Sequence, residues 1–149
     1  MEIHDSDIGS VLRQMLRDIR DMDPEPIGAM FRFELEKCDP KEGAYVFRCG
    51  TLPWMTNTAG VLHGGMGAAI MDQAMSFVAR AVKPAQAATM TVQLQVEHHR
   101  PIVPGEKLRV FVSTVSMGHT LMNFRCEVFR QEHMDRPCLS GSGIFYNKH

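Results

Sequence analysis

Hydrophobic and polar residues alternate along the chain with two periods, one typical of helices and one typical of strands. Between residues 6 and 22 apolar side chains recur at i, i+3 and i+4, which predicts an amphipathic helix. Asp5 or Ser6 is suited to cap its start, and two prolines follow its end. Residues 63–82 predict a second helix, longer and more apolar, after a glycine-rich entrance.

Period-two alternation predicts the strands. Two strands, at about 31–36 and 44–49, flank a turn and are expected to form a hairpin. The clearest alternation comes after the second helix, where polar residues separate Met90, Val92, Leu94 and Val96. Further strands are expected near residues 108–112, 122–128 and 138–146.

The order of these elements predicts the fold class. One helix cannot cover both faces of a five- or six-stranded sheet, so we expect an α+β fold in which a curved, largely antiparallel sheet wraps around the helix of residues 63–82. The basic residues of the helix at 6–22 would also suit a membrane surface, but its acidic residues dilute them, so we expect this helix to pack on its own domain. The chain has 149 residues, which fits a single domain over residues 1–149.

Composition and charge remove several functional classes. The chain has 16 Lys and Arg against 17 Asp and Glu, a balance without the basic surface that nucleic acid or anionic membrane would need. Asp72 and Gln73 interrupt the longest apolar segment, and the N-terminus lacks the pattern of a signal peptide. The four cysteines and seven histidines show no metal-binding spacing, so reduced thiols, a cytoplasmic location and no metal or other cofactor are expected.

Asp72 is the only ionisable side chain between His63 and Arg80. At 100° per residue, the helix face centred on Asp72 carries small residues: Gly65, Ala68, Ala69, Ser76 and Ala79. The opposite face carries Met66, Ile70, Phe77 and Ala81, three of them bulky core-filling residues. The Asp72 face therefore allows a close approach, either by a neighbouring helix or by a thin substrate.

His63 and Asp72 lie too far apart to form one compact site within a chain. They are nine residues apart, so they are about half a turn out of phase and roughly 13 Å apart along the helix. If both take part in chemistry, Asp72 of one subunit must meet the entrance of another. The helical geometry therefore favours a site at a subunit interface.

The entrance itself has the chemistry to bind a carbonyl oxygen. Free amides of Gly64 and Gly65 at a helix N-terminus are hydrogen-bond donors, and glycine lets a reacting group approach the backbone. Asn57 can add a side-chain amide, and Ser76, one turn beyond Asp72, can orient a water molecule. Each feature also has a plainer interpretation: a structural turn at His-Gly-Gly, a solvated carboxylate, a serine bonded to its own helix.

The combined pattern resembles a known family. Asn57-x-x-Gly60-x-x-His63-Gly64-Gly65 followed by Asp72 is similar to the signature of the hotdog-fold acyl-CoA thioesterases of the phenylacetyl-CoA and 4-hydroxybenzoyl-CoA type. The resemblance continues through Arg100-Pro101-x-x-x-Gly105 and covers roughly residues 30–147. It implies a hotdog fold and the hydrolysis of acyl-CoA to the free acid and CoA by a homodimer or homotetramer.

The resemblance also implies roles for single residues. The carboxylate of Asp72 would act as nucleophile or general base, and the amide of Gly64 would polarise the thioester carbonyl. Asn57 would support that carbonyl across the dimer, and His63 would shape the entrance. Either Ser76 or Thr91 would supply the hydroxyl that orients water.

Other residues would contact the rest of the substrate. The resemblance implies CoA contacts near Gly65, Arg100 and His119, although His98-His99 replaces the family's usual aromatic-plus-variable pair before Arg-Pro. We expect the acyl pocket to involve the second flank of the central helix and residues 53–55, and to take either medium-chain or aromatic acyl groups.

Two other functions remain possible on the same fold. One is a non-catalytic acyl-CoA-binding or regulatory module, which the presence of Asp72, Asn57 and His63 disfavours. The other is a dehydratase or hydratase, whose paired histidine and acid belong to a different motif that this sequence lacks.

Overall fold

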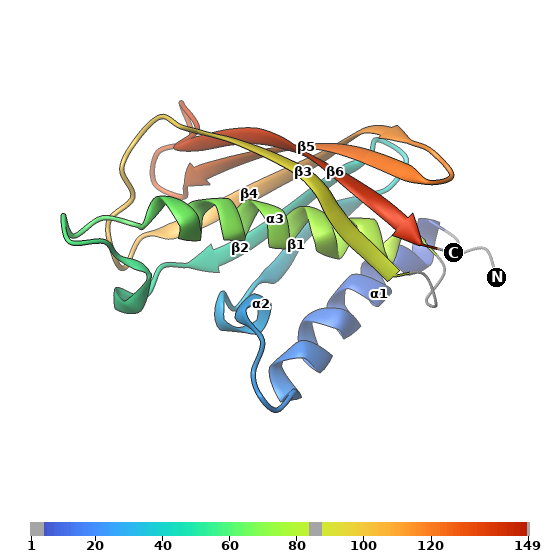
Figure 1. Cartoon of the computed structure of the whole chain (residues 1–149), viewed down its shortest axis with the longest axis horizontal. Helices are drawn as coiled ribbons and strands as arrows, with labels where there is room; N and C mark the ends of the chain where they lie inside the picture. The colour runs from blue at the N-terminus through green and yellow to red at the C-terminus, as the bar shows by residue number, and fades with distance from the viewer. Residues whose placement is uncertain (1–4, 84–87, 149) are drawn as a thin grey trace.

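A six-stranded antiparallel sheet curves around one long helix in the computed structural model, which describes residues 5–83 and 88–148 (Figure 1). The helices are α1 (Asp5–Asp18), α2 (Ile27–Met30) and α3 (Gly64–Ala81), with short 3₁₀ turns η1 (Ile19–Asp21) and η2 (Pro53–Met55). The strands are β1 (Glu34–Asp39), β2 (Ala44–Gly50), β3 (Ala88–His98), β4 (Lys107–Met117), β5 (Leu121–Arg130) and β6 (Leu139–Lys148). This is the hotdog arrangement that the sequence predicted.

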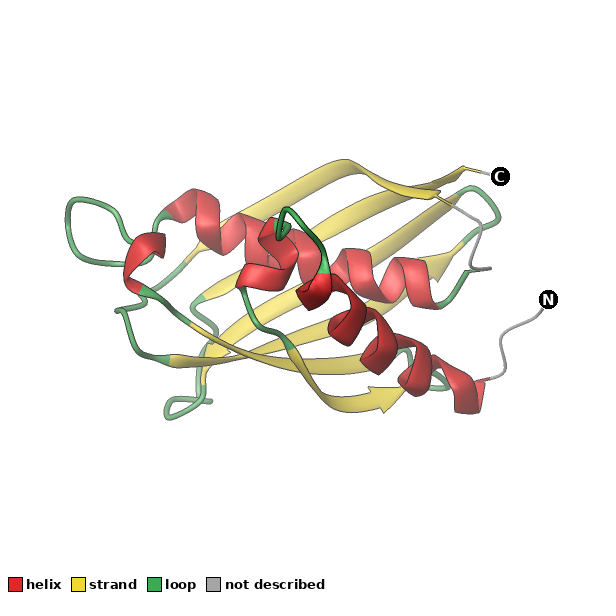
Figure 2. Ribbon diagram, turned by 90° about the horizontal axis from the view of Figure 1, so that it is seen from below, coloured by secondary structure: helices red, strands yellow, loops and turns green. Residues whose placement is uncertain are grey.

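The strand order is β1-β2-β4-β5-β6-β3, and all neighbouring strands are antiparallel. Strand β3, which follows α3 in the chain, therefore lies at one edge of the sheet, and β1 lies at the other. Figure 2 shows α3 along the concave face of the sheet and α1 crossing below it. An edge strand leaves one row of backbone groups without a partner in the same chain.

Helix α3 has the orientation that its sequence predicted. Ile70, Phe77 and Ala81 on the core side are at most 1% exposed, and Met66 packs partly buried against them. Phe33 makes edge-to-face contacts with Phe77 and with Phe47 of the sheet, which joins α3 to β2. None of the described helices is long and apolar enough to cross a membrane.

Helix α1 covers the other side of the core, as its apolar spacing predicted. Ile8, Leu12 and Leu16 are buried, and the helix contacts α3 and β1. It continues into η1, so the helical segment ends at Asp21, one residue before the predicted end. The predicted capping by the side chain of Asp5 or Ser6 lies outside the described side chains.

The predicted first strand, at 31–36, is wrong at its beginning. Phe31 and Phe33 are buried, but they precede β1, which starts at Glu34. Phe31 follows α2, and Arg32 between the two phenylalanines has a positive φ of 53°. A tight turn therefore brings both rings into the core with the same period of two that a strand would show.

The predicted alternation of β3 is also wrong at one residue. Thr91 pairs with Phe145 and Gln93 pairs with Ile144, so Val92 is an extra residue in a β-bulge. Met90 and Val92 are 51% and 59% exposed, whereas Leu94 and Val96 pack partly buried against the core. The bulge therefore reverses the alternation along β3. After it Leu94 and Val96 face the core, whereas before it Thr89 and Thr91 are on the side that faces the core.

Candidate functional site

Asp72 lies midway along α3, and its carboxylate is held by β3. The Thr91 hydroxyl donates a hydrogen bond of 2.7 Å to Asp72 Oδ1. This contact exists because the bulge at Val92 turns Thr91 toward the helix. Ser76, one turn further along α3, is half-buried and has no recorded hydrogen bond to Asp72. Of the two hydroxyls that the sequence left open, Thr91 is the one in contact with the carboxylate.

The Thr91 contact leads to a test by substitution. Thr91→Val keeps the shape of the side chain and removes the donor, so we expect kcat of any reaction that depends on Asp72 to fall about tenfold. Ser76→Ala is the matched variant, with a change of less than about threefold expected because no bond to Asp72 is lost. Steady-state kinetics on both variants would contradict this assignment if Ser76→Ala had the larger effect.

His63 caps the N-terminus of α3. Its Nδ1 accepts a hydrogen bond of 2.9 Å from the Gly65 amide, while the amides of Met66 and Gly67 bond to the His63 carbonyl. The Gly64 amide has no partner among the described residues. A Cβ on Gly65 would stand 3.0 Å from His63 Nδ1, so glycine at this position lets the ring fold back over the helix. One free donor, that of Gly64, is thereby left at the positive end of the helix.

The loop before α3 is fixed by its own hydrogen bonds. Asn57 Oδ1 accepts from the amides of Ala59 and Val61, and the Asn57 amide bonds to the Val61 carbonyl. The His63 amide bonds to the Met55 carbonyl. Asn57 therefore uses its side-chain oxygen to close the loop, and its exposed NH₂ group is the part left to act as a donor.

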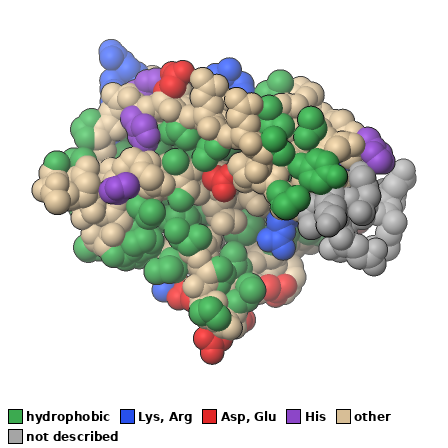
Figure 3. All heavy atoms as spheres, viewed as in Figure 1, with side chains coloured by type: hydrophobic (Ala, Val, Ile, Leu, Met, Phe, Trp, Pro, Cys, Tyr) green, Lys and Arg blue, Asp and Glu red, His purple; other side chains and the backbone are tan. Residues whose placement is uncertain are grey.

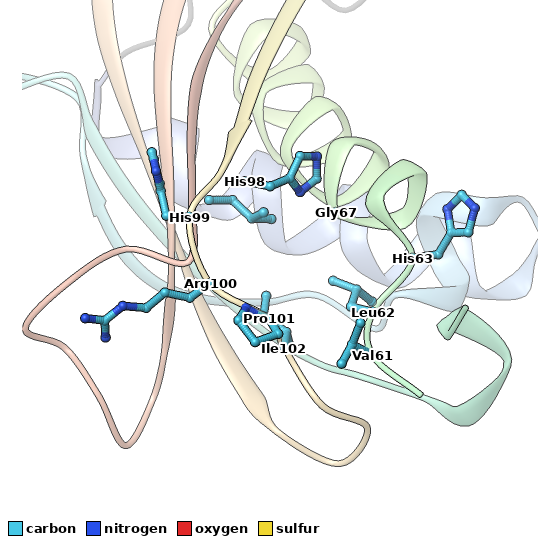
Figure 4. Close-up of a pocket in the computed structure, with 10 residues that line it drawn as sticks. Val61, Leu62, His63, Gly67, His98, His99, Arg100, Pro101 and Ile102 are labelled. Atoms are coloured by element: carbon cyan, nitrogen blue, oxygen red, sulfur yellow. The ribbon is translucent and has the colours of Figure 1, made fainter. Parts of the chain in front are cut away.

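A pocket of about 320 Å³ opens beside this entrance. Figure 4 shows His98 between the strand and the helix, with Leu62, Pro101 and Ile102 near one another and the Arg100 side chain extending away from them. The apolar residues of the pocket are Val61, Leu62, Pro101, Ile102 and Leu139. The face drawn in Figure 3 has its histidines gathered mainly at the left end, where α3 begins. The pocket therefore combines three histidines and an arginine with an apolar wall.

Of the residues predicted to contact CoA, Gly65 and Arg100 lie at the start of α3, whereas His119 lies near its end. Arg100 lines the pocket at the start of the helix and lies 4.0 Å from Asp135. His119 is exposed in the turn between β4 and β5, and this turn accepts a 3.0 Å hydrogen bond through the Gly118 carbonyl from Lys83, just after α3. One protomer therefore does not bring Arg100 and His119 together.

The buried cysteines are poor nucleophiles. Burial raises the pKa of Cys49 to about 12, and it raises the pKa of Cys126 and Cys138 as well. In residues 5–83 and 88–148, no three His, Cys, Asp or Glu side chains come together as a possible metal site. Among the described residues, Asp72 is a carboxylate on α3 that a hydroxyl group, that of Thr91, holds in position.

His98 is the residue of this region that the sequence did not single out as part of a site. The strand alternation could have identified it, because His98 follows Leu94 and Val96 at steps of two and should lie on the same, inward face of the strand. The would-be Cβ positions of Gly64 and Gly67 each lie 3.5 Å from His98 Cε1. The ring therefore rests on the first turn of α3.

Comparisons with known proteins agree with this architecture. The family model of the thioesterase superfamily matches residues 59–136. No curated protein sequence matches. Among solved structures, the PaaI protein from the phenylacetic acid degradation operon of E. coli has a TM-score of 0.79 at 14% identity, covering 97% of this chain and 96% of that one.

Two further solved structures share the fold. A phenylacetic acid degradation-related protein from Ralstonia eutropha JMP134 has a TM-score of 0.77 at 18% identity, covering 91% of this chain and 98% of that one. A thioesterase protein from Streptococcus pneumoniae TIGR4, solved with coenzyme A, has a TM-score of 0.67 at 19% identity, covering 77% and 87%. At these identities the likeness concerns the fold.

Proposed function

The chain belongs to the thioesterase superfamily and is a thioester hydrolase, and from this we propose that it hydrolyses acyl-CoA thioesters to the free acid and CoA. The observation that carries the proposal is the pairing of two features on one helix. Asp72 is held by Thr91 in the middle of α3, and Gly64 presents a free amide at its start. A carboxylate and an unpartnered backbone donor are the two groups that thioester hydrolysis needs.

In the proposed reaction the thioester carbonyl oxygen accepts a hydrogen bond from the Gly64 amide. Asp72 attacks the carbonyl carbon, or it removes a proton from an attacking water, and Thr91 holds the carboxylate in place during either step. The negative charge that develops on the oxygen is stabilised at the helix N-terminus. CoA then leaves as a thiolate. If Asp72 is the nucleophile, the acyl group is left on it as an anhydride, and water hydrolyses this anhydride to the free acid and regenerates the carboxylate; if Asp72 is the base, the acid forms directly. This chemistry requires no cofactor.

We propose that each active site is shared between two subunits. His63 caps α3 and Asp72 lies nine residues further along the same unbroken helix, roughly 13 Å along its axis, so the two ends of the site are held apart in one chain. Strand β3 lies at the sheet edge beside Asp72 and exposes Met90 and Val92, which suits contact with a second copy. A homodimer is the smallest assembly that this proposal needs, and a homotetramer built from such dimers would contain the same sites.

Free-thiol release from a panel of acyl-CoAs tests the function. We expect turnover on at least one member of a panel with short, medium, long and aromatic acyl groups, read as the increase in free thiol. The aromatic phenylacetyl group is a natural member, because similar structures come from phenylacetic acid degradation. Absence of thiol release from every member would overturn the proposal and favour a binding module.

A further inference from the structure

The imidazole of His98 lies against the N-terminal turn of α3. A Cβ on Gly64 would stand 3.5 Å from His98 Cε1 and 3.7 Å from Nε2, and a Cβ on Gly67 would stand 3.5 Å from Cε1. Since neither glycine has a side chain, the ring lies flush on the helix backbone. Figure 4 shows His98 between β3 and the start of α3.

The nitrogens of His98 are not used by the fold. No hydrogen bond or ion pair of His98 is recorded within residues 5–83 and 88–148. The neighbouring His99 points to the other face of the strand, where its Nε2 lies 2.7 Å from the Ser140 hydroxyl. His98 borders the pocket of about 320 Å³, so a ligand there can reach its free ring edge.

We propose that His98 is a second hydrogen-bond donor to the thioester carbonyl oxygen, beside the Gly64 amide. This inference rests on the proposed function. In a helix the N–H bonds and the Cα–Cβ bonds of the first turn both point toward the N-terminus, so an oxygen bound to the Gly64 amide lies on the side where the His98 ring stands. The ring edge nearest this position carries Nε2, which donates in the tautomer protonated there.

His98 neither gains nor loses a proton in this role. When the nucleophile adds to the carbonyl carbon, the electron pair of the C=O π bond moves to oxygen, and the oxyanion accepts hydrogen bonds from Gly64 and His98. The carbonyl then re-forms as the C–S bond breaks, and the electron pair of that bond leaves with the thiolate of CoA.

The test compares His98→Phe with His133→Phe. His98→Phe keeps a ring against the helix and removes the donor, so we expect kcat to fall about 30- to 100-fold while KM changes less than about threefold. His133→Phe is the matched control, an exposed histidine that does not line the pocket, and it should retain kcat within about twofold. His98→Gln, which restores an N–H at a similar reach, should recover part of the loss.

A series of thioesters with different thiols separates oxygen binding from protonation of the leaving group. If His98 donates to the carbonyl oxygen, His98→Phe lowers kcat by the same factor for thiols of low and high pKa. A loss that grows with the pKa of the thiol would overturn the proposal, because it would identify His98 as a general acid. An active wild type with an equally active His98→Phe variant would overturn this inference alone, whereas an inactive wild type would refute the proposed function.

Discussion

Replacing Asp72 with asparagine is expected to lower kcat for acyl-CoA hydrolysis by about 10³-fold. Asparagine has the size of aspartate, and its side-chain oxygen can still accept the 2.7 Å hydrogen bond from Thr91. The packing of α3 against β3 should therefore remain. What is lost is the negative charge, which is needed either to attack the thioester or to take a proton from water.

Two measurements define the outcome for Asp72→Asn. Thiol release gives kcat, and calorimetry with a non-hydrolysable acyl-CoA analogue gives the affinity, which we expect to change less than about threefold because Asp72 acts on the reacting carbon. Asp72→Glu is the matched control, since it keeps the charge on a longer side chain. A variant Asp72→Asn that retained more than about a tenth of the wild-type kcat would exclude Asp72 as nucleophile or base.

The fold and the position of Asp72 could be predicted because both depend on local periodicity. The 3.6-residue period of residues 63–82 placed Ile70 and Phe77 on the core side and Asp72 among small residues, as the structure confirms. The nine-residue spacing of His63 and Asp72 also predicted that one chain would keep them apart. Helix α3 runs unbroken from its cap at His63 past Asp72, so the two residues lie roughly 13 Å apart along its axis.

The partner of Asp72 could not be predicted with the same certainty, because it depends on pairing between distant strands. The bulge at Val92 is defined by the register of β3 against β6, about fifty residues further along the chain. Without the bulge Thr91 would share a face with the outward-pointing Gln93. A single extra residue therefore decides which hydroxyl meets the carboxylate.

The surroundings of Phe31 and His98 likewise could not be predicted from local sequence periodicity. The turn that precedes β1 depends on a positive φ at Arg32, a conformation that the residue type disfavours and the sequence does not announce. The contact of His98 with Gly64 and Gly67 depends on how closely β3 crosses α3. Periodicity gives the face of a residue, whereas the surrounding fold determines what that face meets.

Replacing Gly64 with proline is expected to lower kcat by about 10²- to 10³-fold, the effect of removing one donor from an oxyanion site. Proline lacks the N–H but is favoured at the first position of a helix, which Gly64 occupies in α3. His63 before it has φ −59° and ψ 134°, a conformation that proline permits in its preceding residue. The substitution should therefore remove the donor and leave the helix intact.

Gly64→Ala is the matched control for Gly64→Pro, because it adds a side chain at this position but keeps the backbone N–H donor. Its Cβ would stand 3.5 Å from His98, an ordinary van der Waals contact, and its N–H is retained. We expect Gly64→Ala to keep kcat within about fivefold of the wild type, with circular dichroism and thermal unfolding unchanged in both variants. Equal losses in the alanine and proline variants would show that the added side chain, and not the missing N–H, is responsible.

Mixing the Asp72→Asn and Gly64→Pro variants tests whether one site uses both subunits. In a mixed dimer of this design, the Gly64→Pro chain supplies an intact Asp72 and the Asp72→Asn chain supplies an intact Gly64 amide, so one of the two sites is complete. Random reassociation makes half of the dimers mixed, and activity should therefore return to about a quarter of the wild-type value. A site contained within one chain would stay inactive in the mixture, because every chain would still lack either the carboxylate or the donor.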